Sequence, residues 1–376
     1  MKTKRLFALL LALAMILSLA ACGTKNNEAP ESAEPTTAQT AEPTDAQDEA
    51  PESDTRIFTD STGREVEVPT KIDRIALSGP MAQIVLFALC PDKLVGISNA
   101  WSSEAEQYLD EKYFNMPQIG QLYGGKGELN LETLLDSGAQ VVIDVGEPKG
   151  SIKEDMDGLQ EQTGIPFIHI TASMNSYPEA YRMLGDLLGM KDEAEKLAQY
   201  CEKIYERTVK LAESVEKANV LYVTGGDGQN VIAAGSYHAE VLDLLTNNLA
   251  VVDEPSSKGT GNEVSMEQIL NWDPDIVVFA PDSVYADVAN DEAWQSVTAI
   301  KNGTYYEVPF GPYNWMGFPP SVQRYLGMVW LSRLLYPEAT EEYDLFSDVH
   351  EYYELFYHCD LTQEQYDGLV ANSIGK

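Results

Sequence analysis

Two stretches of the chain repeat one pattern at a fixed distance, and this pattern decides the fold. Residues 130–143 read NLETLLDSGAQVVI and residues 265–278 read SMEQILNWDPDIVV, so the two stretches align position by position without a gap. Each copy combines a helix-capping residue, Asn130 or Ser265, with a short helical pattern and an apolar run typical of a buried parallel strand. The repeat therefore predicts two similarly built halves.

Apolar runs alternate with helical patterns on both sides of the repeat, which indicates α/β architecture. Strands are expected at 74–77, 94–97, 141–145 and 167–170 in the first half, and at 220–224, 248–252, 276–280 and 304–308 in the second. Between the halves, residues 191–217 contain neither Gly nor Pro and carry apolar residues at helical spacing. We therefore expect a first lobe at 56–190, one connecting helix at 191–217 and a second lobe at 218–376.

The segment 1–55 differs in composition from the rest of the chain. A basic start is followed by an apolar run over residues 6–21, which is typical of a signal peptide. The run ends in LAACG around Cys22, which resembles the lipobox of bacterial lipoproteins. We expect residues 1–21 to be removed and Cys22 to carry a lipid; an ordinary signal peptide with an incidental cysteine is the alternative. Residues 22–55 lack aromatic side chains and predict a disordered acidic tether.

Composition and motifs limit the classes of function. The 376 residues hold 25 Lys and Arg against 60 Asp and Glu, a formal net charge of −35. Such a chain lacks the basic surface that nucleic acids require. Four cysteines without a CxxC pair exclude a zinc knuckle and a disulfide-dense scaffold. Because no GxSxG, HExxH or Walker A motif occurs, the sequence favours a protein that is not an enzyme and needs no cofactor.

With its lipobox, its repeat and its two lobes on one long helix, the chain resembles the substrate-binding lipoproteins of ABC importers for iron complexes and vitamin B12. The resemblance runs from about residue 56 to the C-terminus and includes RIALSG at 74–79 and FYHCDLTQEQY at 356–366. It implies two Rossmann-like lobes joined by one long helix, with a ligand cleft between them. It also implies a lipid-anchored monomer at the extracytoplasmic face of the cell membrane. Such a protein passes a small-molecule metal complex to a permease dimer and, through it, to cytoplasmic ATPase subunits.

The resemblance leaves the ligand open. A ferric siderophore-type complex is the expected ligand, and haem, cobalamin and the oxyanions molybdate and tungstate are alternatives. A receptor for bare zinc or manganese typically uses several histidines, whereas this chain holds four in all. A surface sensor without transport and a metal-dependent enzyme are the remaining alternatives.

Candidate ligand contacts follow the predicted strands, because open α/β sheets bind ligands beyond the carboxyl ends of their strands. They are Ser78, Tyr123 and Lys126 in the first half, and Ser236, Tyr237, His238, Tyr313, Trp315 and Arg324 in the second. The aromatic residues suit the rings of a chelate, and a guanidinium suits an anionic ligand. Tyr237 and His238 are in addition candidate iron ligands. Each of these residues also has a structural interpretation, as a packed loop, an internal ion pair or a hydrogen-bonded histidine.

The resemblance assigns permease docking to one surface glutamate on each lobe. Glu132 and Glu267 occupy matching positions of the repeat. Charge-assisted pairs with arginines of the permease would orient the complex and speed its formation. The alternative is that each carboxylate only stabilises the first turn of its own helix.

Overall fold

The computed structural model describes residues 54–123 and 128–374, which belong to one unit that spans Glu52–Lys376. The expected signal peptide, the lipidation site Cys22 and nearly all of the expected tether lie outside the described residues, as does Lys126. Among the helices of the described ranges, none combines the length and the apolar character needed to cross a membrane.

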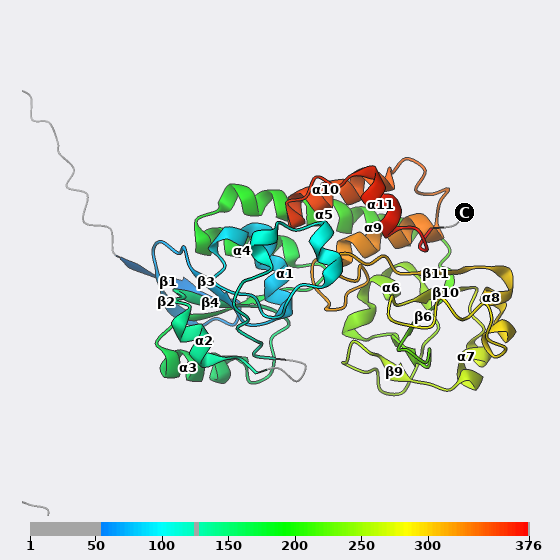
Figure 1. Cartoon of the computed structure of the whole chain (residues 1–376), viewed down its shortest axis with the longest axis horizontal. Helices are drawn as coiled ribbons and strands as arrows, with labels where there is room; N and C mark the ends of the chain where they lie inside the picture. Colours follow the sequence, from blue (N-terminus) through cyan, green and yellow to red (C-terminus); the bar gives the residue numbers. More distant parts are fainter. Residues whose placement is uncertain (1–53, 124–127, 375–376) are drawn as a thin grey trace, which may run out of the picture. The chain divides into compact units, whose positions relative to one another are not determined.

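The first half is built on a three-stranded parallel sheet in the order β3-β4-β5 (Figure 1). Its strands are β3 (Ile75–Leu77), β4 (Val141–Gly146) and β5 (Phe167–Thr171), preceded by an antiparallel hairpin of β1 (Thr55–Thr59) and β2 (Glu65–Pro69). Its helices are α1 (Pro80–Leu89), α2 (Leu131–Asp136), α3 (Ile152–Thr163) and α4 (Tyr177–Leu188). No continuous strand forms at 94–97, where one was expected. Leu94 makes an isolated bridge with Ile75, and Ile97 makes another with Gln118, so the segment pairs with two different parts of the chain.

The second half holds a mixed sheet in the order β11-β10-β6-β7-β9, with β8 beside β6. The strands are β6 (Asn219–Thr224), β7 (Asn230–Val231), β8 (Asn247–Asn248), β9 (Asn262–Glu263), β10 (Ile276–Phe279) and β11 (Tyr305–Glu307). Strands β6, β8, β10 and β11 are parallel, whereas β7 is antiparallel to its neighbours. The strand expected at 248–252 stops at Asn248, because the side chain of this residue accepts a hydrogen bond from the Ala250 N–H at 3.1 Å and turns the chain.

The helix caps predicted from the internal repeat are confirmed. Asn130 Oδ1 accepts a hydrogen bond from the Thr133 N–H at 3.0 Å at the start of α2. Ser265 Oγ accepts one from the Gln268 N–H at 3.2 Å at the start of α7 (Met266–Trp272). The strands that follow, β4 and β10, begin at Val141 and Ile276, which again occupy matching positions of the repeat.

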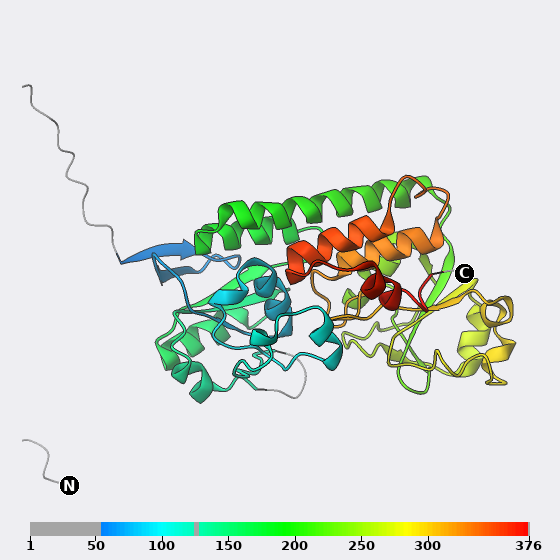
Figure 2. The same ribbon diagram turned by 45° about the horizontal axis from the view of Figure 1, so that its top comes forward.

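The connecting helix α5 (Lys191–Ser214) lies along both halves, beside α9 (Arg324–Leu335) and α10 (Leu345–Tyr357) (Figure 2). Its 24 residues make a rod of about 36 Å. It ends before the expected limit of 217, because Val215 is extended where the chain turns into β6. Its buried face belongs to one hydrophobic core that includes α1, α4, α9 and α10. The other helices are α6 (Glu240–Leu245), α8 (Thr298–Asn302) and α11 (Gln363–Leu369).

The C-terminal segment returns from the second half to the first. The rings of Phe87 in α1 and His358 lie 5.9 Å apart, and Gln365 Nε2 in α11 donates to the Gln107 carbonyl at 2.7 Å. These contacts fasten the end of the chain across the two halves.

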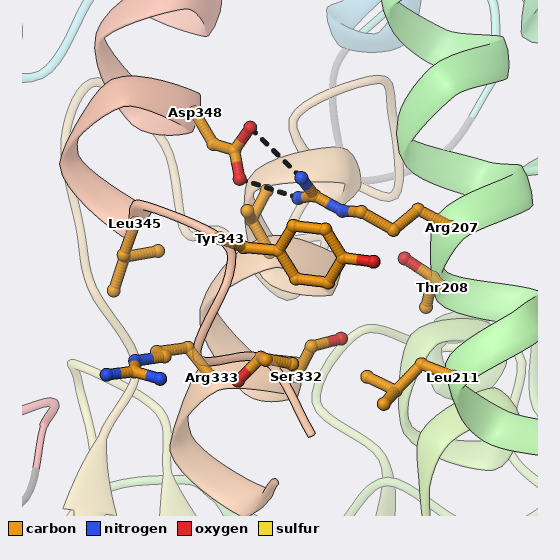
Figure 3. A pocket seen from close by; sticks show the side chains of 10 residues that line it. Arg207, Thr208, Leu211, Ser332, Arg333, Tyr343, Leu345 and Asp348 are labelled. Carbon is orange, nitrogen blue, oxygen red and sulfur yellow. Dashed lines mark hydrogen bonds and ion pairs between the residues drawn. The ribbon is translucent and has the colours of Figure 1, made fainter. Parts of the chain in front are cut away.

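A small cavity of about 10 Å³ lies where α5, α9 and α10 meet (Figure 3). Two parallel hydrogen bonds join Arg207 to Asp348, with Nη1–Oδ1 at 3.2 Å and Nη2–Oδ2 at 2.6 Å. The Arg207 guanidinium also lies 4.3 Å from the ring centroid of Tyr343. This volume is about that of a single water site, so the contacts serve to fix α10 against α5.

The close approach of α4 to α5 predicts a sharp difference between two glycine substitutions. A Cβ on Gly185 would lie 2.6 Å from Ala194 Cβ, so Gly185→Ala should force the two helices apart and lower the free energy of unfolding by about 1–3 kcal/mol. Gly158 in α3 has no atom within 4 Å of the corresponding position, so Gly158→Ala should leave stability unchanged or raise it by up to about 1 kcal/mol. Urea unfolding of both variants tests this; equal stability would contradict it.

Candidate functional site

A cleft with two adjoining compartments lies between the halves, and the smaller compartment is at the carboxyl ends of β3 and β4. The smaller one, of about 80 Å³, is lined by Ser78–Ala82, Tyr123, Asp144–Glu147 and Lys149 from the first half, and by Tyr237 from the second. The larger one, of about 620 Å³, is lined by Glu147, Met174, Tyr205, Gly235–Tyr237, Glu240, Asp243, Leu244 and Met328. Glu147 and Tyr237 line both compartments, so the two lie side by side.

Buried polar groups form hydrogen bonds with one another at one side of the smaller compartment. Ser78 Oγ donates to Asp144 Oδ1, and Asp144 Oδ2 lies 2.7 Å from Nδ1 of the fully buried His169. The other ring nitrogen of His169 lies 3.2 Å from Thr171 Oγ1. The imidazole therefore has a partner on each nitrogen, and it fixes the Asp144 carboxylate at the edge of the cavity.

The phenol groups of the smaller compartment donate to acceptors of the protein itself. Tyr123 Oη donates to Asp155 Oδ2 at 2.7 Å, and Tyr237 Oη donates across the cleft to the Ala172 carbonyl at 3.3 Å. Burial raises the pKa of both phenols above the usual value of 10, so both are neutral at physiological pH. Together with the carboxylates of Asp144 and Glu147, they offer the cavity mainly hydrogen-bond acceptors.

Ser236 begins the short 3-10 turn η4 (Tyr237–Ala239) and lines the larger compartment. Its Oγ accepts from the His238 N–H at 3.2 Å and donates to the Ser256 carbonyl at 3.1 Å. The ring of His238 is buried within the second half, where its Nδ1 lies 3.4 Å from the Gly317 carbonyl oxygen. His238 thus lies behind Tyr237 and lines neither compartment.

The loop between β11 and α9 reaches the first half without lining the two compartments. Tyr313 Oη accepts from Gln83 Nε2 at 3.2 Å, and its ring packs against Trp101 with centroids 5.9 Å apart. Ser321 Oγ donates to the Met81 carbonyl at 3.3 Å. Trp315 is fully buried in the hydrophobic core. The loop therefore joins the halves, and its tryptophan packs inside.

Arg324 supports Tyr237 from behind. It is fully buried at the start of α9, where its Nη1 donates to the Tyr237 carbonyl at 3.0 Å and to the Glu240 carboxylate. Its guanidinium lies 4.8 Å from the centre of the Tyr237 ring. Its Nη2 is buried and makes no hydrogen bond to any described residue. Arg324 is thus a positioning residue in this structure, with one donor group that no described residue uses.

The structure brings four predicted residues together at the cleft: Ser78, Tyr123, Ser236 and Tyr237. It places His238, Tyr313, Trp315 and Arg324 behind or beside the cleft. Asp144 and Glu240 also line the cleft, although neither was predicted from the sequence. An acidic residue inside the otherwise apolar run VVIDV at 141–145 is the signal that could have found Asp144.

Glu132 and Glu267 lie in the first turns of α2 and α7, and both are exposed. Figure 1 shows these two helices in different halves, on the side away from α5 and α10. Neither carboxylate forms a hydrogen bond or an ion pair with another residue in the described part of the chain. Both are therefore accessible to a partner.

Comparison with known proteins gives one family and several relatives. A family model described as periplasmic binding protein matches residues 75–311, more than half of the chain. The molybdate-binding protein MolA of Haemophilus influenzae is 25% identical over 334 residues, which cover 80% of this chain and 91% of that protein. The iron-uptake system-binding protein of Bacillus subtilis is 24% identical over 319 residues, covering 81% and 90%. An ABC transporter solute binding protein from Sulfurospirillum deleyianum superposes with a TM-score of 0.76 at 26% identity, covering 84% and 99%.

The burial of His238 predicts a pH dependence of stability. Burial lowers the pKa of His238 below 6.5, so the neutral ring stabilises the fold above this pH and the stability is lost as the pH falls through the lowered pKa. His238→Gln should remove the share of this loss that His238 causes. That share is at most about 1.4 kcal/mol of unfolding free energy per pH unit. Urea unfolding at pH 7.5, 6.5 and 5.5 measures it. An unchanged pH slope in the variant would show that His238 does not titrate in this range.

Proposed function

The chain belongs to the periplasmic binding protein family, and from this premise we propose that it captures a metal chelate of the ferric siderophore type and delivers it to a permease dimer of an ABC importer. Members of this family bind solutes outside the cytoplasm for ABC transporters. The proposal is carried by the cleft in which Glu147 of the first half and Tyr237 of the second line the same two compartments. Because both halves contribute to this site, a ligand there would contact both of them at once.

The size and polarity of the cleft support a chelate. The larger compartment, at about 620 Å³, has the volume typical of small-molecule sites. Asp144 and Glu147 outnumber the one cationic residue of the same lining, Lys149, so the compartment suits a neutral or positively charged complex better than a dianion. The relative from Bacillus subtilis, named an iron-uptake system-binding protein, agrees with this assignment.

Molybdate is the second candidate, and specific observations favour it. The first turn of α1 lines the smaller compartment, carries no acidic residue and has no side-chain cap, so its N–H groups suit an anion. The relative from Haemophilus influenzae is named a molybdate-binding protein. Haem, cobalamin and tungstate are further ligands to test.

The proposed location is the extracytoplasmic face of the cell membrane. It is supported by the sequence alone, with a leader at 1–21, lipid on Cys22 and a tether at 22–55. The working part of the molecule is then the two lobes at 56–190 and 218–376 with the helix between them, acting as a monomer.

A ligand panel tests the proposal. Purified protein is mixed with ferric hydroxamate and catecholate complexes, haem, cobalamin, molybdate and tungstate, and its Tm and binding stoichiometry are measured. We expect a metal chelate to bind one to one, with about 2.7 kcal/mol of stabilisation at 100 times its Kd. Glu147→Lys should weaken the chelate and strengthen molybdate, whereas Glu354→Lys on the exposed side of α10 should change neither. One-to-one binding of molybdate alone would replace the chelate proposal.

Docking by the two glutamates gives a separate prediction. The double variant Glu132→Lys, Glu267→Lys should abolish uptake in cells, because it places two positive charges against the arginines that the family resemblance implies on the permease. Ligand affinity of the purified variant should equal that of the wild type. Glu193→Lys, Glu354→Lys is the matched control, since it makes the same change of charge at exposed positions on α5 and α10. Lost ligand affinity in the first variant would instead indicate a structural role.

A further inference from the structure

Each glutamate of the internal repeat has an exposed leucine beside it. Leu135 of α2 is 51% exposed and Leu270 of α7 is 37% exposed, and the two occupy matching positions of the repeat, as Glu132 and Glu267 do. They are two of the eight large hydrophobic side chains exposed in the described part of the chain. The same pair of residue types therefore lies on the surface of both halves.

Helical geometry places each leucine next to its glutamate. Residues three apart on a helix are neighbours on its surface, so Glu132 shares a face with Leu135, and Glu267 shares a face with Leu270. The residues just before the leucines, Leu134 and Ile269, are fully buried and hold the two helices on their sheets. The exposed part of each leucine packs against nothing in the described part of the chain, and leaving it in water costs free energy.

We infer that Leu135 and Leu270 are apolar anchors of the docking surface, each of which enters a recess beside a basic side chain in one subunit of the permease dimer. This inference rests on the proposed function. The partner follows from two features of the surface: two unpaired carboxylates select basic groups, and the duplication of one Glu-Leu pair on both lobes fits a partner with two-fold symmetry.

The two residue types have different kinetic effects. Exposed charges at the rim of an interface mainly set the association rate and its dependence on salt. A leucine that leaves water only in the docked complex mainly sets the dissociation rate. The leucines therefore determine how long the complex lasts, and the glutamates determine how fast it forms.

The experiment measures binding of the full chain to the permease–ATPase complex of the proposed importer, held in lipid nanodiscs, by surface plasmon resonance. Leu135→Ser and Leu270→Ser should each raise the dissociation rate about tenfold, and the double variant about a hundredfold, because distant sites act additively. The association rate and its salt dependence should stay as in the wild type. Leu135→Met should bind as the wild type does, because it keeps an apolar side chain.

Two controls separate the docking effect from general effects. Ile57→Ser removes an even more exposed side chain, at 59%, from β1, and it should not change binding. Glu132→Gln, Glu267→Gln should lower the association rate and weaken its salt dependence. Equal Tm and equal ligand affinity of all variants show that each one is folded.

The outcomes distinguish this inference from the proposed function. If the leucine variants bind like the wild type while the glutamine variant binds more slowly, the anchors are refuted and docking by the glutamates stands. If wild-type protein does not bind the complex at all, the proposed function fails. If wild-type protein forms a dimer in sedimentation and Leu135→Ser abolishes it, the surface joins two copies of this chain and the inference is refuted.

Discussion

One hydrophobic core shared by the two halves is the constraint on which the structure depends. The buried face of α5 packs against α4 of the first half and α9 of the second, and α10 returns across both. Opening the halves by a large angle would expose this apolar surface to water, at about 25 cal/mol for each Å². The core therefore holds the two sheets at a nearly fixed distance and limits the motion that ligand capture can use.

This fixed distance gives the cleft its form. The carboxyl ends of β3 and β4 present Ser78 and Asp144, and the second half brings Tyr237 against them. Two of these groups are held by a buried partner: His169 supports Asp144, and Arg324 supports Tyr237. The binding surface is thus positioned by polar and charged groups that lie behind it and that do not line it.

The same constraint acts at the surface. The helices α2 and α7 come from the two copies of the repeat and lie in different halves, away from α5 (Figure 1). Because the core fixes the halves, the distance between the Glu-Leu pairs on these helices is also fixed. A partner that contacts both pairs at once therefore recognises the arrangement of the two halves as well as the residues.

The α/β alternation, the capped helices of the repeat and the long helix could all be predicted before the structure, because each is encoded by neighbouring residues through periodicity or capping. The limits of that information appear at two expected strands: the one at 94–97 depends on partners elsewhere in the chain, and the one at 248–252 is ended by the side chain of Asn248. Tertiary structure alone decided which predicted site residues meet. Trp315 and Tyr237 both follow strands, yet one is buried in the core and the other lines the cleft, since residues far away in the sequence cover the first and leave the second open.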